Sequence, residues 1–600
     1  MRARNLATDF NLTEGLIRQH SGRNSFQRGQ QYYRVSVVRS LVRRGGVIEA
    51  EVEGSRPRPY RVRVCFDVGG VASAACTCPY DEGGWCKHVV AALLTCLHEP
   101  SAIEERESLE TRLAGLTAEQ LREVLLRIAG RDSSLADALE RQLDLLSRDF
   151  PQDATAGTKS RRTVDGRSIR RAVRDVLHSL DRMRASEAYW QVGAVVDGVR
   201  EILDEARERL AAGDGDGALA ILEAVTEAYL DGWEGLDDSN GEASAFFEDL
   251  ANSWMEALLS VDLTAAEGNA WAARLESWAD DLEEDYGVGE GLCAAALAAS
   301  ERWDNPALKA VLQGRMADDT EALAALVAEP PNLAIARLNV LERQERFKEY
   351  LRLARVMGQT EACASMLVRL GRLKEAVEYG RKHLQTADGA LRLAQLLRDR
   401  GALKEALEVA EYGTRLSGPK AELETWLCDL ARGTGQTELA LRAAVLAFRE
   451  RPDLSVYLSA RELAGPGWDS LRDELLTGLR GTKPPFPAGP VEVFLHEGLI
   501  EDAMVAVKGS WDYRLIEHVA EAAIETHPDW VIETCRNQAE AIMHPGRADL
   551  YGTAVRWLGY AREAYRVAGC EHEWQAYLQE LIVRHARKYK LRPMLEALRR

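Results

Sequence analysis

The chain has 600 residues, of which 46% are hydrophobic, and this is ample material for a folded core. No segment stays apolar long enough to serve as a signal peptide or to cross a membrane. The ten cysteines are mostly dispersed, as in a reduced compartment and not in a disulfide framework. We therefore expect a cytoplasmic protein with no membrane partner.

Positive charge is concentrated in the first part of the sequence. The first 100 residues carry fourteen Lys or Arg and nine Asp or Glu, whereas the whole chain has a formal net charge of −19, so the remainder carries −24. An acidic surface disfavours DNA along most of the chain and suits a basic protein partner or simple solubility. Any contact with nucleic acid is therefore expected in the basic first part.

Two segments of this basic part alternate polar and apolar residues, as strands do. Residues 47–53 (VIEAEVE) place three glutamates on one face, and residues 60–66 (YRVRVCF) place Arg61 and Arg63 on one face. Antiparallel pairing of the two strands would set these charges opposite each other in a cross-strand ladder. Those two arginines are therefore expected to be used within the fold.

Seven other cations are candidates for binding phosphate groups. Arg43 and Arg44 precede Gly45-Gly46, a hairpin-turn signal, and we expect them to protrude as a basic tip. Solvated surface charge is the alternative explanation for the whole set. The candidate nucleic-acid contacts are Arg23, Arg28, Arg43, Arg44, Arg56, Arg58 and Lys87.

Three cysteines and a histidine crowd into residues 76–88 (CTCPYDEGGWCKH). Cys76 and Cys78 lie two apart, so at the end of a strand their side chains share one face. A turn-forming loop then brings Cys86 and His88 to the start of an apolar helix. Four such ligands complete the tetrahedron of a structural Zn²⁺ and leave no open position for catalysis. The alternative is a cluster of buried, reduced cysteines without metal.

The order Cys-x-Cys, seven residues, Cys-x-His resembles the SWIM zinc finger of bacterial proteins. Residues 26–38 (FQRGQQYYRVSVV) are similar to the segment that precedes such fingers. The resemblance covers about the first sixth of the chain and implies zinc ligation by Cys76, Cys78, Cys86 and His88. It also implies binding to DNA or protein, a following region of helical repeats and association with helicase-like ATPases.

After residue 100 the pattern changes from strand alternation to helical periodicity. Thr117 and Gln120 form a capping-box signature at the start of an expected helix. A polar segment with Pro, Gly, Ser and Thr then lacks periodic apolar positions and predicts a linker. The predicted organisation is a zinc-finger domain at 1–100, a helical extension at 101–148, the linker at 149–168 and an α-helical repeat region at 169–600.

A short pattern, Gly-x4-Ala, recurs through the last region. Its members are Gly213 with Ala218, Gly371 with Ala376, Gly401 with Ala406, Gly435 with Ala440 and Gly498 with Ala503. The glycine closes one helix and the small alanine lets the next helix pack closely. Two successive spacings of 30 and 34 residues resemble the tetratricopeptide period. The predicted fold is an α+β N-terminal module of short antiparallel strands plus a helix, followed by a mainly all-α, tetratricopeptide-like solenoid.

Enzyme signatures are missing from the sequence. It contains no Gly-x4-Gly-Lys-Ser/Thr phosphate loop, no Gly-x-Ser-x-Gly and no His-Glu-x-x-His. Any ATPase motor is therefore expected on a separate polypeptide. The carboxylates of residues 278–286 (WADDLEEDY) radiate around a helix and predict a solvated face, although they keep a hydrolase in the helical region as a third hypothesis.

Two functional hypotheses from different classes lead. The favoured one is a non-enzymatic adaptor whose zinc finger contacts nucleic acid, with DNA preferred, or protein, and whose solenoid recruits protein partners. The alternative is a protein–protein interaction scaffold with structural zinc and no contact with nucleic acid.

Overall fold

The computed structural model describes residues 12–56, 58–80, 83–129, 164–181, 188–315, 320–481, 487–545 and 547–599. Contacts divide the chain into two compact units, one made of Met1–Thr111 with Gln385–Arg600 and the other of Arg112–Leu384. The predicted linker is described only at residues 164–168, so the predicted domain boundaries stay predictions. Within the described ranges, every helix is too short or too polar to cross a membrane.

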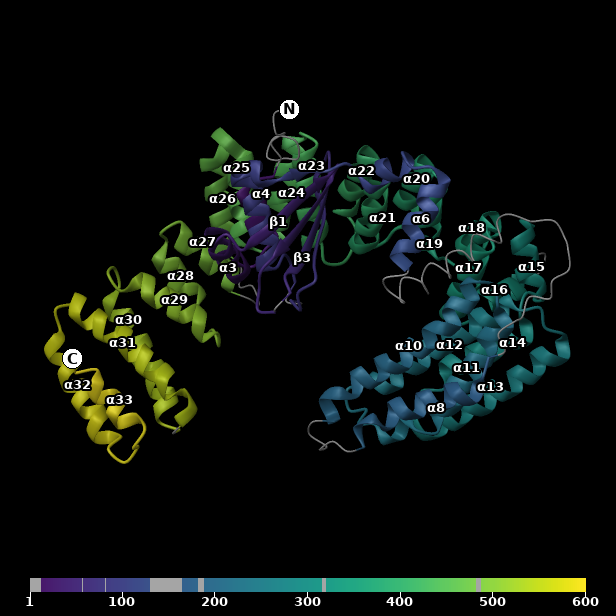
Figure 1. Ribbon diagram of the computed structural model, residues 1–600. Coiled ribbons are helices and arrows are strands. Elements are labelled where there is room, and N and C mark those ends of the chain that lie inside the picture. The colour runs from purple at the N-terminus through teal and green to yellow at the C-terminus, as the bar shows by residue number, and fades with distance from the viewer. Residues whose placement is uncertain are drawn as a thin grey trace. The chain divides into compact units, whose positions relative to one another are not determined.

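A five-stranded sheet with three helices forms the first part of one unit (Figure 1). Its elements are α2 (Glu14–Gln19), α3 (Arg23–Arg34), β1 (Val38–Arg44), β2 (Val47–Val52), β3 (Tyr60–Asp67), β4 (Gly70–Cys76), α4 (Lys87–His98) and β5 (Glu104–Glu105). The strand order is β4-β3-β2-β1-β5, antiparallel except for the β1–β5 pair. Helix α4 packs against the first four strands, and its residues from His88 to Cys96 are buried.

The register of β2 and β3 confirms the predicted charge ladder. Glu49 lies opposite Arg63 and Glu51 opposite Arg61. The intervening side chains of β2 point to the other face and are buried, as the period-two pattern requires. The predicted α+β module is confirmed.

Helices make up nearly all of the remaining described residues. The unit Arg112–Leu384 contains α6 (Ala118–Ala129), α8 (Gly166–Leu177), α10 (Val192–Ala211), α11 (Gly215–Leu230), α12 (Glu242–Ser260), α13 (Ala265–Tyr286), α14 (Glu290–Glu301), α15 (Pro306–Gln313), α16 (Thr320–Val327), α17 (Pro331–Arg343), α18 (Phe347–Val356), α19 (Thr360–Arg369) and α20 (Leu373–His383). Helix α5 (Leu109–Ala114) lies at the division between the units.

The helices that share a unit with the sheet begin after residue 385. They are α21 (Ala387–Asp399), α22 (Leu403–Gly413), α23 (Ala421–Gly433), α24 (Thr437–Glu450), α25 (Leu454–Ala464), α26 (Trp468–Gly481), α27 (Ala488–His496), α28 (Ile500–Ala506), α29 (Tyr513–Ala523), α30 (Pro528–Met543), α31 (Tyr551–Val567), α32 (Glu571–Arg584) and α33 (Leu591–Ala597). The mainly helical region is thus confirmed, while its likeness to tetratricopeptide repeats stays a prediction.

The Gly-x4-Ala pattern marks turns between packed helices. Gly371 and Gly401 have φ values of +72° and +73°, a left-handed conformation that glycine adopts without strain. Ala376 and Ala406, five residues later, are fully buried. The helices that flank these glycines pack together as the pairs α19–α20 and α21–α22. The structure therefore confirms the predicted roles: glycine ends one helix, and the small alanine lets the next helix pack closely.

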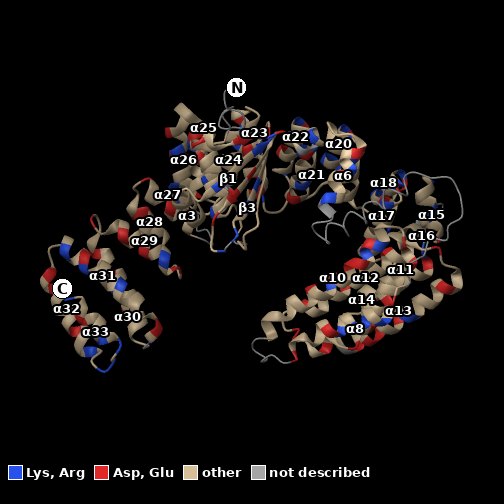
Figure 2. Ribbon diagram, in the orientation of Figure 1, with Lys and Arg blue, Asp and Glu red and all other residues tan. Residues whose placement is uncertain are grey.

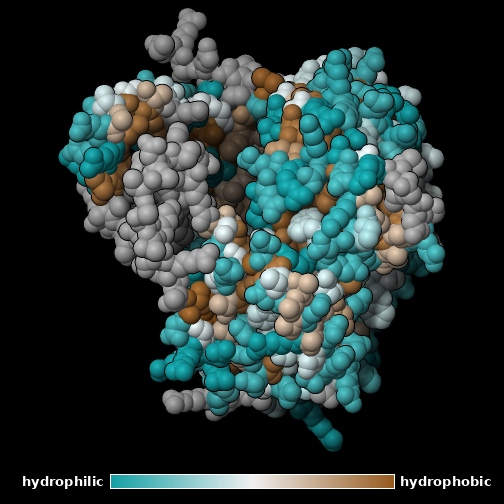
Figure 3. Space-filling model, turned by 90° about the vertical axis from the view of Figure 1, so that its right-hand side faces the viewer, coloured by the Kyte–Doolittle hydropathy of each residue, from teal (hydrophilic) through white to brown (hydrophobic). Residues whose placement is uncertain are grey.

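Apolar side chains fill the interior of the helical regions. In one unit the fully buried residues include Trp254 and Phe246, and in the other they include Trp557. Figure 2 shows both signs of charge interspersed along the helices. The coloured surface visible in Figure 3 is mostly hydrophilic, with small hydrophobic patches. Packing of apolar helix faces therefore stabilises these regions.

Candidate metal centre

Strand β4 and helix α4 position the four predicted ligands. Cys76 is the last residue of β4, and Cys86 is the N-cap of α4, with His88 in the first turn. Thr77, between the first two cysteines, donates its N–H to the carbonyl of Arg61 and accepts the N–H of Arg61 on its hydroxyl, both at 3.0 Å. This two-way pairing with β3 fixes the chain where Cys76 and Cys78 turn inward.

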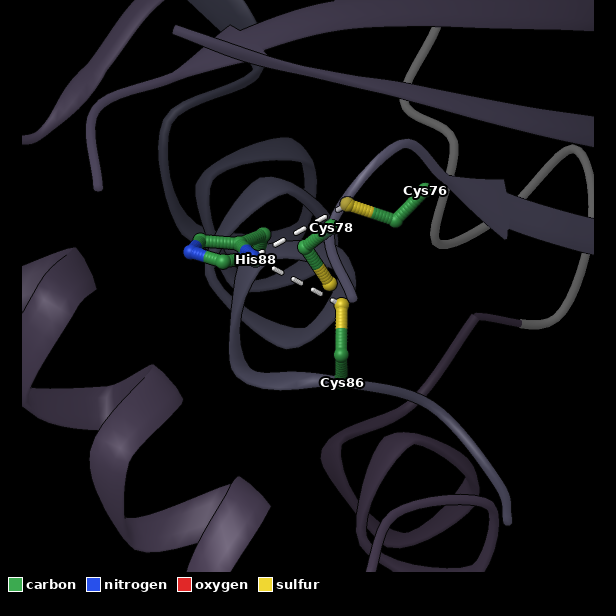
Figure 4. Close-up of side chains that lie close together, drawn as sticks. All are labelled: Cys76, Cys78, Cys86 and His88. Atoms are coloured by element: carbon green, nitrogen blue, oxygen red, sulfur yellow. Dashed lines mark hydrogen bonds between the residues drawn. The ribbon is translucent and has the colours of Figure 1, made fainter. Parts of the chain in front are cut away.

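The four side chains converge on one point (Figure 4). The Nδ1 atom of His88 lies 3.8 Å from the Sγ of Cys76 and 3.8 Å from the Sγ of Cys86. All four potential ligand atoms, including Cys78 Sγ, lie within 4.8 Å of one another. A tetrahedral zinc site with ordinary Zn–S and Zn–N bond lengths has ligand–ligand distances of about 3.4–3.8 Å. The quartet therefore fits Zn²⁺ after a small contraction.

The three thiols cannot all ionise so close together without a cation. A hydrogen bond from the Cys76 thiol lowers the pKa of Cys86 to about 3, and the same interaction raises the pKa of Cys76. Burial is the main cause of the raised pKa of Cys78. A divalent cation removes this conflict, because it stabilises several thiolates at once. The spacing of the four ligand atoms, close to that of a zinc tetrahedron, therefore favours metal over the alternative of a reduced cysteine cluster.

Aromatic rings surround the histidine ligand. The His88 ring centroid lies 4.5 Å from that of Tyr60 and 5.6 Å from that of Tyr32. Its Nε2 atom is buried and has no hydrogen-bond partner among the described residues. A Cβ atom at Gly54 would lie 2.3 Å from the Tyr60 ring and 3.1 Å from His88 Nε2, so only glycine leaves room there. Tyr32, Gly54 and Tyr60 were not predicted to lie at the site, because nothing in their local pattern links them to the cysteines.

The loop that carries Cys86 is tied to helix α23 of the same unit. The Trp85 ring stacks on His20 with a centroid distance of 4.7 Å, and the backbone N–H of Trp85 donates to the His20 carbonyl. His20 Nε2 lies 2.7 Å from one carboxylate oxygen of Asp429, and the Gln19 amide donates to the other at 3.1 Å. The metal loop is therefore linked through His20 to the helical region.

The turn between β3 and β4 makes a second contact with the helices. Arg398 on α21 donates from Nε and Nη2 to the two carboxylate oxygens of Asp67, at 2.7 and 2.9 Å. The Arg398 side chain is only 6% exposed. Beside this pair, a Cβ atom at Gly433 would lie 2.0 Å from the Gly69 carbonyl oxygen, so the two backbones meet at glycine. The sequence offered no signal for this docking.

The expectation that Arg43 and Arg44 protrude is wrong. Arg43 is buried and bonds to the Gly45 carbonyl at 3.0 Å and to Glu105 at 3.4 Å. Arg44 donates to the carbonyl of Glu107 at 3.1 Å and lies 3.7 Å from a carboxylate oxygen of Glu49. Strand β5, which pairs in parallel with β1, brings Glu105 and the Glu107 carbonyl within reach of the two arginines. A two-residue strand is too short to be seen in a sequence pattern.

Two of the other predicted cations contact the aromatic rings beside His88. The Nζ of Lys87 sits 4.6 Å from the Tyr32 ring centroid, and the guanidinium of Arg56 sits 6.0 Å from that of Tyr60. Arg28 precedes Tyr32 by one helical turn of α3 and is exposed. Arg58 is also exposed, in the segment before β3, and Arg23 begins α3. Lys87 and Arg56 therefore lie against the two tyrosines that flank His88, and Arg28 lies one helical turn from Tyr32.

The carboxylates considered for a hydrolase do not converge. Asp280, Asp281, Glu283 and Glu284 are exposed on α13, around the buried Leu282. In the described parts of the chain, Cys76, Cys78, Cys86 and His88 are the one group of metal-binding side chains close enough to hold an ion. The acidic run therefore has the geometry of a solvated helix face.

Comparison with known proteins gives a consistent result for the metal-binding segment. Residues 60–97 match the family model of the SWIM zinc finger. The zinc finger SWIM domain-containing protein 8 homolog of Drosophila melanogaster is 33% identical over 103 residues, which cover 17% of this chain and 5% of that protein. Zinc finger SWIM domain-containing protein 8 of Bos taurus is 35% identical over 102 residues, covering 16% of this chain and 7% of that protein.

The similarity to these relatives is thus confined to a short segment, and the chain spans only 5–7% of their length. A circular tandem repeat protein with novel repeat topology aligns to 72% of this chain and 97% of its own, with 17% identity. The TM-score of 0.18 for that alignment assigns no shared fold.

Proposed function

Because residues 60–97 form a SWIM zinc finger, we propose that this protein is a non-enzymatic, cytoplasmic adaptor whose finger contacts nucleic acid, with DNA preferred. The helical regions recruit protein partners, among which a separate ATPase is the kind expected from the resemblance. Zinc holds the fold of the finger and supplies no open coordination position for a substrate.

One observation carries the nucleic-acid part of the proposal. Lys87 and Arg56 flank His88 through Tyr32 and Tyr60, and Arg28 is presented from the same face of α3 as Tyr32. Side chains of this kind bind phosphate groups through charge-assisted hydrogen bonds. Because the metal fixes α4 against the sheet, zinc binding would also fix the spacing of these cations.

The second candidate is a protein-interaction scaffold without nucleic-acid binding. The pairing of Arg43 and Arg44 with acidic residues favours it, since it removes two of the seven candidate phosphate contacts. None of the ten cysteines forms a disulfide, which agrees with a reducing compartment in either case.

A salt titration of the full chain separates the two candidates. The test variant is Arg28→Ala/Arg56→Ala/Arg58→Ala, and the matched control is Arg39→Ala/Arg61→Ala/Arg63→Ala. The control removes the same charge from positions where Glu53, Glu51 and Glu49 face the arginines. Zinc content is measured in both.

The adaptor proposal expects duplex DNA to bind with an affinity that falls as salt rises. The logarithm of the binding constant falls linearly with the logarithm of the salt concentration. Removing one cation that binds a phosphate reduces the steepness of this fall by about 0.9. We therefore expect a clearly shallower salt dependence in the test variant and a smaller change in the control. Equal affinity and slope in the two variants, or absence of binding by the parent protein at low salt, would favour the scaffold.

A further inference from the structure

The acidic helical region contains one strongly basic segment. Residues 584–592 (RHARKYKLR) carry five Lys or Arg and no Asp or Glu, in a chain whose formal net charge is −19. They span the end of α32, the connecting loop and the first residues of α33. Figure 2 shows the loop between these two helices in the colour of Lys and Arg. This positive charge is therefore confined to one segment of an otherwise acidic helical region.

Hydrogen bonds to neighbouring elements hold the segment in place. The ammonium group of Lys588 bonds to the carbonyls of Met543 and His544 near the end of α30. Arg584 lies 3.3 Å from Glu540 and also contacts Glu580. Leu591 is fully buried, and its N–H donates to the Lys588 carbonyl at 3.0 Å. The loop backbone is therefore ordered before any partner binds.

The remaining side chains of the loop face solvent. Tyr589 is 80% exposed, and Arg587 and Lys590 on either side of it are exposed as well. Within the described parts of the chain, neither cation has an acidic partner at ion-pair distance. In the same segment, burial first and then the charges of Lys588 and Arg584 lower the pKa of His585. The loop thus presents an aromatic ring between two available positive charges.

We propose that Arg587, Tyr589 and Lys590 form a contact for single-stranded nucleic acid, in which the cations bind phosphates and the ring stacks on a base. An acidic peptide would use the cations but has no need of a ring held open to solvent, whereas every nucleobase has a face that stacks on tyrosine. The contact uses none of the residues of the zinc finger, so it stands independently of the function proposed for that module.

Fluorescence anisotropy with the full zinc-loaded chain tests the contact, with labelled oligothymidylate as the probe. The first variant is Arg587→Ala/Lys590→Ala, and its charge-matched control is Lys374→Ala/Lys404→Ala, which removes two exposed lysines from α20 and α22. Tyr589→Ala is compared with Tyr589→Phe, which keeps the ring. Unlabelled polyglutamate serves as a competitor.

We expect Arg587→Ala/Lys590→Ala to reduce the steepness of the salt dependence by about 1.4, since each phosphate contact with a single strand contributes about 0.7. Tyr589→Ala should weaken binding about tenfold, with Tyr589→Phe close to the parent protein, because stacking needs the ring and not the hydroxyl. The lysine control should bind as the parent does.

Equal binding by the loop double variant and the lysine control overturns the proposal. Displacement by polyglutamate, together with unchanged binding by Tyr589→Ala, overturns it in favour of an acidic peptide. If the finger variant Arg28→Ala/Arg56→Ala/Arg58→Ala loses binding while the loop variants keep it, the finger proposal stands and the loop proposal fails. If the loop variants lose binding while the finger variant keeps it, the loop proposal is supported and nucleic-acid binding by the finger is rejected.

Discussion

The zinc finger and the helical regions are stabilised in different ways. Between Cys76 and Cys86, the described side chains are exposed or half-buried, and the segment relies on its four ligands and on backbone pairing with β3. In the helical regions turns are followed by buried residues, as Gly371 is by Ala376, so stability is spread over many small contacts. Removal of one ligand should therefore destroy the finger, whereas removal of one side chain between helices should only weaken the helical region.

Replacing a ligand should have the largest effect. Cys76→Ser or His88→Ala should release zinc and unfold the finger while the helical circular dichroism signal persists, because structural zinc contributes about 10–16 kcal/mol to such modules. Metal analysis and limited proteolysis measure the two effects. Cys65→Ser, on neighbouring β3, is the control and should keep its zinc. Full zinc content in Cys76→Ser would contradict the assignment of the ligands.

Breaking the contact between the finger and α21 should have the next largest effect. Arg398→Ala leaves the Asp67 carboxylate without its paired guanidinium, and we expect a loss of about 2–4 kcal/mol in the free energy of unfolding. Arg39→Ala, which removes an exposed pair with Glu53, should cost less than about 1 kcal/mol. Pulse proteolysis of the finger across a urea series measures both, because the thirteen tryptophans of the chain would mask the fluorescence of any single ring. Equal losses in the two variants would show that the finger does not depend on this docking.

A buried carboxyl group in α23 should make the helical region sensitive to pH. Burial, followed by repulsion from Glu450, raises the pKa of Glu424 from 4.5 to about 7, and its Oε2 atom has no partner among the described residues. The Glu424 carboxyl group ionises near pH 4.5 in the unfolded chain and only near pH 7 in the folded chain. Its contribution to stability is therefore lost as pH rises through this window.

Glu424→Gln should therefore be more stable than the parent protein at pH 8 by about 1–3 kcal/mol, with the difference vanishing near pH 4. Chemical unfolding at the two pH values tests this. Glu422→Gln, an exposed neighbour on α23, is the control and should show no such dependence. A constant difference between the Glu424 variant and the parent protein would contradict the raised pKa.

Features written in local sequence could be predicted. The ligand spacing placed the metal site, the period-two alternation placed β2 against β3, and the Gly-x4-Ala pattern placed the turns. The same turn occurs without the pattern at Glu345, whose φ of +56° is followed by the buried Tyr350. There the turn is set by helix packing, because the local residue does not favour a left-handed conformation.

Features that depend on distant pairing could not be predicted. Arg43 and Arg44 bond to Glu105 and to the carbonyl of Glu107, which follow the apolar helix in the sequence. Asp67 pairs with an arginine in α21, 331 residues later. Neither pairing leaves a periodic signal, since only one or two residues on each side take part. The tyrosines around His88 were missed for the same reason.

The docking of the finger also sets an order of events during synthesis. Asp67 leaves the ribosome 331 residues before Arg398, and His20 leaves it 409 residues before Asp429. At about 5–20 residues per second, the finger waits roughly 20–70 s for Arg398. All four zinc ligands emerge within residues 76–88, long before that. Metal capture on the nascent chain would therefore keep the finger folded until its docking surface has been made.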